Sequence, residues 1–330
     1  MNSPAQPSGL TEPLLDRLAA SGGASASATT VLIALGANVL VAVAKSAAAV
    51  VTGSASILAE AAHSWADTGN QVFLLVANRR ALRPPDRAHP LGHGREAYVW
   101  SLLAALGLFV AGAAVSVTHG VQELYRPEPA TDFIVGYVVL GVSFVLEGIS
   151  FVRSVRQARP TAALLERDVI EQVMATSDPT LRAVFAEDGA ALIGLVIAAA
   201  GLGAHQATGS AKPDAVGSIL VGVLLGVIAL YLINRNRQLL IGEEADPRIR
   251  AATIRALLAD PEVARVTYLR LEIVGPRIVS VIGDVDLVGD DDESHVAVRL
   301  RALEARISAS PAVAGAVLSL SAPDEPSLTA

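Results

Sequence analysis

Six long apolar segments limit what this chain can fold into. They cover about residues 28–52, 55–78, 97–119, 133–152, 189–211 and 215–234. A helix needs roughly 20 consecutive apolar residues to cross the hydrocarbon core of a bilayer. The segments 97–119 and 215–234 contain no Asp, Glu, Lys or Arg. The sequence therefore predicts an α-helical membrane protein with six transmembrane helices.

Composition excludes several other classes of protein. Only 17% of the residues are charged, whereas soluble domains carry about 25%. The net charge of -7 and the absence of a basic patch argue against a nucleic-acid partner. No hydrolase, oxidoreductase or nucleotide-binding signature is present, so an enzyme is not expected. Because the chain has no cysteine, any metal must be held by His, Asp, Glu or water.

The distribution of arginine predicts the orientation in the membrane. Arginines gather in the second-to-third connection, in the fourth-to-fifth connection and after the sixth segment, whereas the alternate loops hold only Arg126 and Lys212. Cytoplasmic loops carry the excess of positive charge. Both termini are therefore expected in the cytoplasm, with the protein in the cell membrane. Residues 1–27, rich in Ser, Ala, Gly and Pro, are expected to form a mobile tail ahead of a transport domain at 28–242.

After Gly242 the composition changes to that of a small soluble domain. Apolar periodicity predicts a helix, two strands, a helix and a strand, at 247–259, 266–274, 278–288, 294–307 and 314–320. This α-β-β-α-β order indicates a cytoplasmic α+β domain of ferredoxin-like type at 243–322, with helices on one face of its sheet, and a tail at 323–330. The acidic run Asp290–Glu293 is interpreted as a solvated turn and helix start.

Two ionisable residues in the second apolar segment are candidate metal ligands. His63 and Asp67 are four residues apart, so on a helix they lie on one face, one turn from each other. Charged groups inside hydrocarbon are costly unless they face a cavity or a partner. The pair can share a divalent ion, or it can form a structural hydrogen bond; the sequence leaves both readings open.

Carboxylates in two further segments are candidates as well. Glu187 and Asp188 open the fifth segment and point about 100° apart on a helix, so at most one of them faces His63 and Asp67. The alternative is a pair of solvated carboxylates at a helix N-terminus. Glu147, inside the fourth segment, is a possible proton carrier, a partner of the metal ligands or a buried structural acid.

The connection between the second and third segments contains Asp86, His89 and His93 within eight residues. Pro90, Gly92 and Gly94 permit tight turns there. One carboxylate and two imidazoles can form a tetrahedral metal site that water completes. The alternative is a polar loop whose histidines make local hydrogen bonds.

These motifs resemble those of the cation diffusion facilitator family of divalent-metal transporters. The resemblance rests on GSASILAEAAHSWAD at 53–67, on Asn70 and Gln71, and on HPLGHG at 89–94, and it extends over residues 30 to about 320. It implies a homodimer that exports zinc or a similar ion against protons, with the transport site between the second and fifth helices. By motif, the transport ligands are His63, Asp67 and Asp188, and the loop ligands are Asp86, His89 and His93.

Two positions depart from the family pattern. Val184 stands where the family usually has His or Asp, so the fourth ligand is Glu187, water or nothing. The Glu187–Asp188 pair resembles the branch that contains a mitochondrial zinc transporter. The tail has a single histidine, His295, so a zinc cluster is not expected there, although Asp284 and Asp286 can offer carboxylates.

The resulting expectation is a proton-coupled exporter of a divalent transition metal, zinc first. Metal ligands must be deprotonated to bind, so protons on the opposite side of the membrane can displace the ion. No resident cofactor is expected. The alternatives are a carrier for another cation, such as Mn, Fe, Co or a monovalent ion, and a membrane-anchored interaction or sensor protein that transports nothing.

Overall fold

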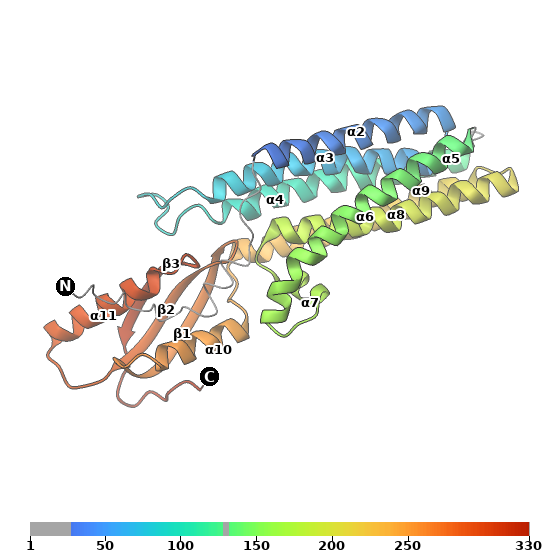
Figure 1. The fold of residues 1–330 in the computed structure, drawn as a ribbon. Coiled ribbons are helices and arrows are strands. Elements are labelled where there is room, and N and C mark those ends of the chain that lie inside the picture. Colours follow the sequence, from blue (N-terminus) through green and yellow to red (C-terminus); the bar gives the residue numbers. More distant parts are fainter. Residues whose placement is uncertain (1–27, 128–131, 330) are drawn as a thin grey trace, which may run out of the picture.

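The structure, a computed structural model, describes residues 28–127 and 132–329. Figure 1 shows a bundle of long helices at one end and a small domain with a sheet at the other. The expected N-terminal tail, residues 1–27, lies outside the described residues.

The helical part of the structure combines long helices with shorter segments. In chain order these are α2 (Ala28–Thr52), α3 (Ala55–Ala81), α4 (Glu96–Gly107), the π-helical segment η1 (Leu108–Ala114), α5 (Val115–Tyr125), α6 (Phe133–Leu164), α7 (Val169–Ala175), α8 (Pro179–Thr208) and α9 (Lys212–Ile241). Within the described residues, four helical stretches are long and apolar enough to cross a membrane: Glu96–Tyr125, α6, α8 and α9. In α2, the residues whose side chains the structure describes give an apolar stretch at Asn38–Thr52. Helix α3 carries the polar residues singled out above.

Helix α9 lies at the centre of the bundle, where it contacts α3, α4, η1, α5 and α8. Its approach to α5 depends on glycine. A Cβ at Gly222 would lie 2.7 Å from Val117 Cγ2, and a Cβ at Gly120 would lie 2.8 Å from the carbonyl oxygen of Ala215. Small residues allow this close contact between membrane helices.

The ends of the fourth and fifth helices differ from the sequence-based expectation. Helix α8 begins at Pro179, ten residues earlier than the apolar segment, because Asp178 caps it by accepting hydrogen bonds from the backbone N–H groups of residues 180 and 181. Glu187 and Asp188 therefore lie inside the helix, and the reading that places them at a helix start is wrong. Helix α6 continues to Leu164, and the short helix α7 was not expected.

The C-terminal domain has the expected order of elements. It contains α10 (Pro247–Leu258), β1 (Val263–Gly275), β2 (Ile278–Leu287), α11 (Glu293–Ser308) and β3 (Val313–Leu320). The sheet order is β1-β2-β3, with β1 antiparallel and β3 parallel to β2. Alternate residues of β2 are buried, and they share one apolar core with Leu257 of α10 and Leu303 of α11. The acidic run is exposed, and Asp292 caps α11, so the predicted turn and helix start are confirmed.

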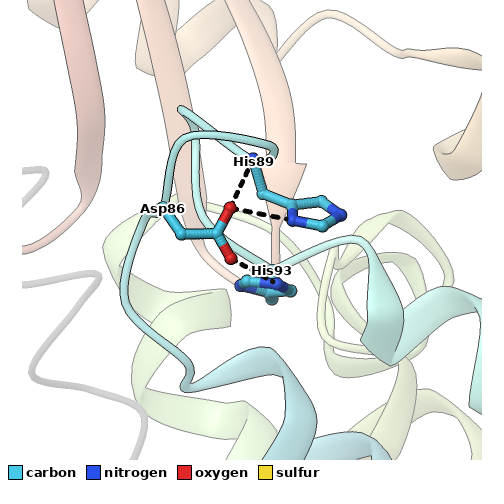
Figure 2. A group of neighbouring side chains, drawn as sticks. All are labelled: Asp86, His89 and His93. Carbon is cyan, nitrogen blue, oxygen red and sulfur yellow. Dashed lines mark hydrogen bonds and ion pairs between the residues drawn. The ribbon is translucent and has the colours of Figure 1, made fainter.

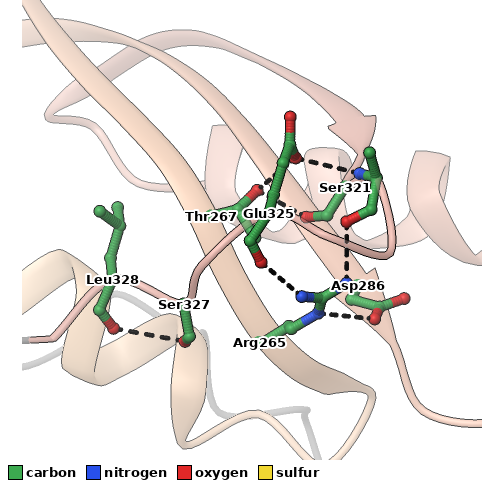
Figure 3. A network of polar contacts seen from close by, with 8 residues as sticks. Arg265, Thr267, Asp286, Ser321, Glu325, Ser327 and Leu328 are labelled. Atoms are coloured by element: carbon green, nitrogen blue, oxygen red, sulfur yellow. Dashed lines mark hydrogen bonds and ion pairs between the residues drawn. The ribbon is translucent and has the colours of Figure 1, made fainter.

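The C-terminal tail packs along β1 (Figure 3). The guanidinium of Arg265 donates to the carbonyl oxygen of Glu325 at 2.6 Å and to Asp286 at 2.9 Å. Further along, the backbone N–H of Leu328 donates to the carbonyl oxygen of Val266 at 2.7 Å. The residues after 322 are therefore held against the edge of the sheet.

Ion pairs join the bundle to the C-terminal domain. They are Arg95–Glu272, Arg167–Asp246, Arg235–Glu243 and Arg277–Asp178. The loop before α4 also touches the turn between β1 and β2, because a Cβ at Gly94 would lie 2.6 Å from the carbonyl oxygen of Val274. The loop that carries Asp86, His89 and His93 is thus fastened to both parts of the molecule.

Candidate metal centre

Helix α3 carries the first pair of candidate ligands. His63 Nε2 lies 3.4 Å from Asp67 Oδ2, and the His63 side chain is fully buried. Both ring nitrogens of His63 and Oδ1 of Asp67 have no hydrogen-bond partner among the described residues. The arrangement therefore differs from a structural pair with satisfied hydrogen bonds, because a buried polar atom that stays unpaired costs about 1–3 kcal/mol.

Glu187 connects α8 to the same region of α3. Its Oε2 accepts a short hydrogen bond from Asn70 Nδ2, and its Oε1 has no partner among the described residues. Asn70 lies three residues after Asp67 on α3. Of the two fifth-helix carboxylates, Glu187 is therefore the one that accepts a hydrogen bond from α3, whereas Asp188 accepts one from α6.

Asp188 is held by a different neighbour. Its Oδ2 accepts a hydrogen bond from Ser150 Oγ of α6 at 2.6 Å. Among the described residues, His63, Asp67 and Asp188 do not bring ligand atoms within 4.8 Å of one another. In this conformation α3 and α8 carry the expected ligands without gathering them into a closed coordination shell.

Val184 offers no atom that can bind a metal, as expected for a valine side chain. It packs against the apolar cluster that contains Leu74 and Leu232. It also lines a pocket of about 140 Å³ together with Ser150, Arg153 and other residues of α6 and α8. This pocket reaches Ser150, the residue that bonds Asp188.

Glu147 belongs to a buried cluster with Lys45 and Glu60. Lys45 Nζ lies 3.1 Å from Glu60 Oε2 and 4.0 Å from Glu147 Oε1. Glu60 had not been singled out from the sequence, although it lies three residues before His63 on the same helix. The three-residue spacing places Glu60 and His63 on one helix face, and this signal would have identified Glu60. Lys45 is fully buried, so it does not extend towards the membrane surface.

The loop between α3 and α4 gathers its three candidate ligands (Figure 2). Asp86 Oδ1 lies 3.1 Å from His89 Nδ1, and Asp86 Oδ2 lies 3.6 Å from His93 Nε2. The two imidazole rings are 4.2 Å apart between centroids. Of the described residues, this is the one group of three or more His, Asp or Glu side chains whose ligand atoms lie within 4.8 Å of one another.

The electrostatics of the loop favour an ionised carboxylate. The backbone N–H of His89, together with its side chain and the N–H of Ala88, holds the pKa of Asp86 below its usual range. His93 is nearly buried, and its Nδ1 has no hydrogen-bond partner among the described residues. One carboxylate and two imidazoles match the ligand types of a zinc site with an open position. The same hydrogen bonds to Asp86 also stabilise the turn.

Comparison with known proteins adds independent information. The cation efflux transmembrane domain family matches residues 31–241, which include α3, α8 and the loop between α3 and α4.

Individual relatives match much of the chain. Metal tolerance protein C4 of Arabidopsis thaliana is 37% identical over 233 residues, which cover 71% of this chain and 51% of that protein. The mitochondrial proton-coupled zinc antiporter SLC30A9 of Homo sapiens is 34% identical over 238 residues, or 72% of this chain and 42% of that protein. The cation-efflux pump FieF of Shewanella oneidensis is 28% identical over 228 residues, or 69% of this chain and 71% of that protein. The matched region thus spans about half the length of the first two relatives.

Proposed function

Because this chain belongs to the cation efflux family, we propose that it is a transporter that exports a divalent transition-metal ion, zinc first, in exchange for protons. The family and the apolar helices support a membrane protein that transports divalent metal. The names of two relatives, a proton-coupled zinc antiporter and a cation-efflux pump, support the finer proposal about the ion and the protons.

One observation carries the site assignment. Buried ligand atoms on α3 and α8 lack hydrogen-bond partners among the described residues: both nitrogens of His63, Oδ1 of Asp67 and Oε1 of Glu187. Atoms that are buried and unpaired are unfavourable unless something binds them. A divalent ion would supply the missing interaction for one nitrogen of His63, for Oδ1 of Asp67 and for Oε1 of Glu187. Imidazole with carboxylates suits zinc, iron or cobalt better than magnesium or calcium.

The proposed mechanism is competition between metal and protons. His63, Asp67 and Asp188 bind the ion when they are deprotonated, and Glu187 or water completes the shell. In this mechanism Asp188 gives up its hydrogen bond from Ser150 when it binds the ion, through rotation of its side chain or a movement of α8 relative to α6. On the opposite side of the membrane, protons take the place of the metal and release it.

The remaining architecture is part of the same proposal. We place both termini in the cytoplasm. Six helical spans cross the cell membrane, and they are α2, α3, α4 to α5, α6, α8 and α9. We keep the division into 28–242 and 243–322, with a ferredoxin-like C-terminal domain that joins two copies of the chain. The loop ligands Asp86, His89 and His93 form an auxiliary site.

Calorimetric titration with Zn²⁺ tests the assignment. The background variant carries Asp86→Ala and His93→Ala, so that the loop does not contribute. Asp67→Ala and Asp188→Ala are each expected to remove the remaining tight site. Asp214→Asn is the control, because Asp214 is an even more deeply buried carboxylate that accepts its hydrogen bonds from Ser54 and Ser56. Unchanged Zn²⁺ binding in both test variants would remove the assignment.

A further inference from the structure

A buried lysine lies between two buried glutamates beside the proposed transport site. Lys45 of α2 and Glu60 of α3 have no exposed side-chain surface, and Glu147 of α6 exposes 17% of its side chain. The ammonium is 3.1 Å from Glu60 and 4.0 Å from Glu147. Three helices therefore bring one cation and two carboxylates together inside the bundle.

The cluster holds more acidic than basic groups. With all three groups ionised, one ammonium faces two carboxylates, and the charges of Glu60 and Glu147 repel each other. Glu60 Oε1 has no hydrogen-bond partner among the described residues. It lies against Gly194 of α8, where a Cβ would collide with it, so the absence of a side chain at Gly194 makes room for this oxygen. The cluster thus has a ligand atom without a partner among the described residues and two carboxyl groups for one ammonium.

The cluster also acts on the neighbouring ligands. The charge of Lys45 interacts with His63 and Asp67 of α3. From α8, Glu187 and Asp188 complete the set of charged groups around Asp67. A divalent ion near His63 and Asp67 would therefore be repelled by the ammonium of Lys45.

We propose that Glu60 and Glu147 form a second cation-binding site, in which the ammonium of Lys45 is the resident cation that keeps a second divalent ion out. Lys45 then limits this part of the bundle to a single transported ion. That the transported ion is a divalent metal rests on the proposed function. The second site itself requires only the two carboxylates and a cation. A purely structural ion pair predicts instead that no metal binds when Lys45 is removed.

The test is a Co²⁺ titration of the full chain, with bound metal counted per chain after removal of free ion. The background carries Asp67→Ala, Asp86→Ala and His93→Ala, so that neither of the sites described above contributes. Adding Lys45→Met is expected to raise the bound metal by about one ion per chain, because oxygen ligands without a cation attract divalent ions. Lys45→Arg keeps the charge and is expected to add none.

The carboxylates provide the second part of the test. Glu60→Gln or Glu147→Gln, added to the Lys45→Met variant, is expected to remove the additional ion. Should Lys45→Met not yield folded protein, Lys45→Gln, which is polar but also uncharged, decides the question in the same titration. The proposal is overturned if the folded Lys45→Met or Lys45→Gln variant binds no additional ion, or if the additional ion persists when Glu60→Gln is added. Because Asp67 is already replaced, a failure of the proposed transport site leaves this result unaffected.

Discussion

Ser150 holds Asp188 on the side of α6 through a hydrogen bond of 2.6 Å. Ser150→Ala removes this donor, so Asp188 no longer exchanges a hydrogen bond for the metal ion. We expect Zn²⁺ to bind roughly three- to tenfold more tightly, which corresponds to the net free energy of one such hydrogen bond. Calorimetric titration of the purified protein measures the change.

Ser154→Ala is the matched control. Ser154 lies one turn further along α6, and its hydroxyl donates to the carbonyl oxygen of Phe151, so its removal is expected to leave Zn²⁺ affinity unchanged. Equal affinities in the two serine variants would show that Ser150 does not position Asp188.

The loop residues give a second prediction at this scale. Asp86→Ala combined with His93→Ala is expected to remove one weaker zinc site while transport continues, because these residues lie between α3 and α4 and outside both helices. Metal counting and flux measurements on the same preparation check both halves of the statement. Complete loss of flux would mean that the loop, and not the pair on α3, is the transport site.

At the scale of single elements, the carboxyl group that caps α11 predicts how the stability of this helix changes with pH. The hydroxyl of Ser294 and the N–H of His295 donate to Asp292, and these hydrogen bonds hold the pKa of its carboxyl below the usual range. A depressed pKa means that the carboxylate stabilises the fold above the unfolded pKa of about 3.9. This contribution is lost as the pH falls through the lower pKa of the folded state.

We therefore expect Asp292→Ala to increase amide hydrogen exchange in the first turn of α11 at pH 7. After correction for intrinsic exchange rates, the difference from the unmodified chain should shrink as the pH falls below about 4. Asp290→Ala is the control, because Asp290 lies in the same acidic run but does not cap the helix. A difference that stays constant with pH would argue that the carboxylate charge has no part in capping.

The helices and strands could largely be located from apolar periodicity, whereas several ends could not. The strands expected at 278–288 and 314–320 are Ile278–Leu287 and Val313–Leu320. Helix α8 was misjudged because Arg182, Glu187 and Asp188 interrupt the apolar residues of its first turns, and because its start depends on the Asp178 cap. A cap leaves no apolar signal, since capping is a local hydrogen bond and not a matter of burial.

The candidate site was predictable to the extent that it depends on one helix. The spacing of His63 and Asp67 follows from the period of α3. The contacts from Lys45 to Glu60 and from Ser150 to Asp188 join different helices. They depend on tertiary packing, which the pattern of a single segment does not encode.

At the scale of the whole molecule, the proposed dimer should not depend on zinc in the C-terminal domain. In the described part of that domain, no three His, Asp or Glu ligand atoms lie within 4.8 Å of one another. Its one histidine, His295, is exposed and interacts with Asp292. Light scattering of the full chain is expected to give the same mass before and after treatment with a chelator. Dissociation on chelation would show that metal holds the two copies together.

The central claim is that the protein exchanges a divalent metal for protons through His63, Asp67 and Asp188. Zinc flux into proteoliposomes, measured with and without an imposed pH gradient, tests it most directly. We expect an outward-directed proton gradient to drive zinc accumulation, and we expect Asp67→Ala to abolish it while the protein remains folded. Zinc flux that is indifferent to the pH gradient, or that persists in Asp67→Ala, would contradict the account.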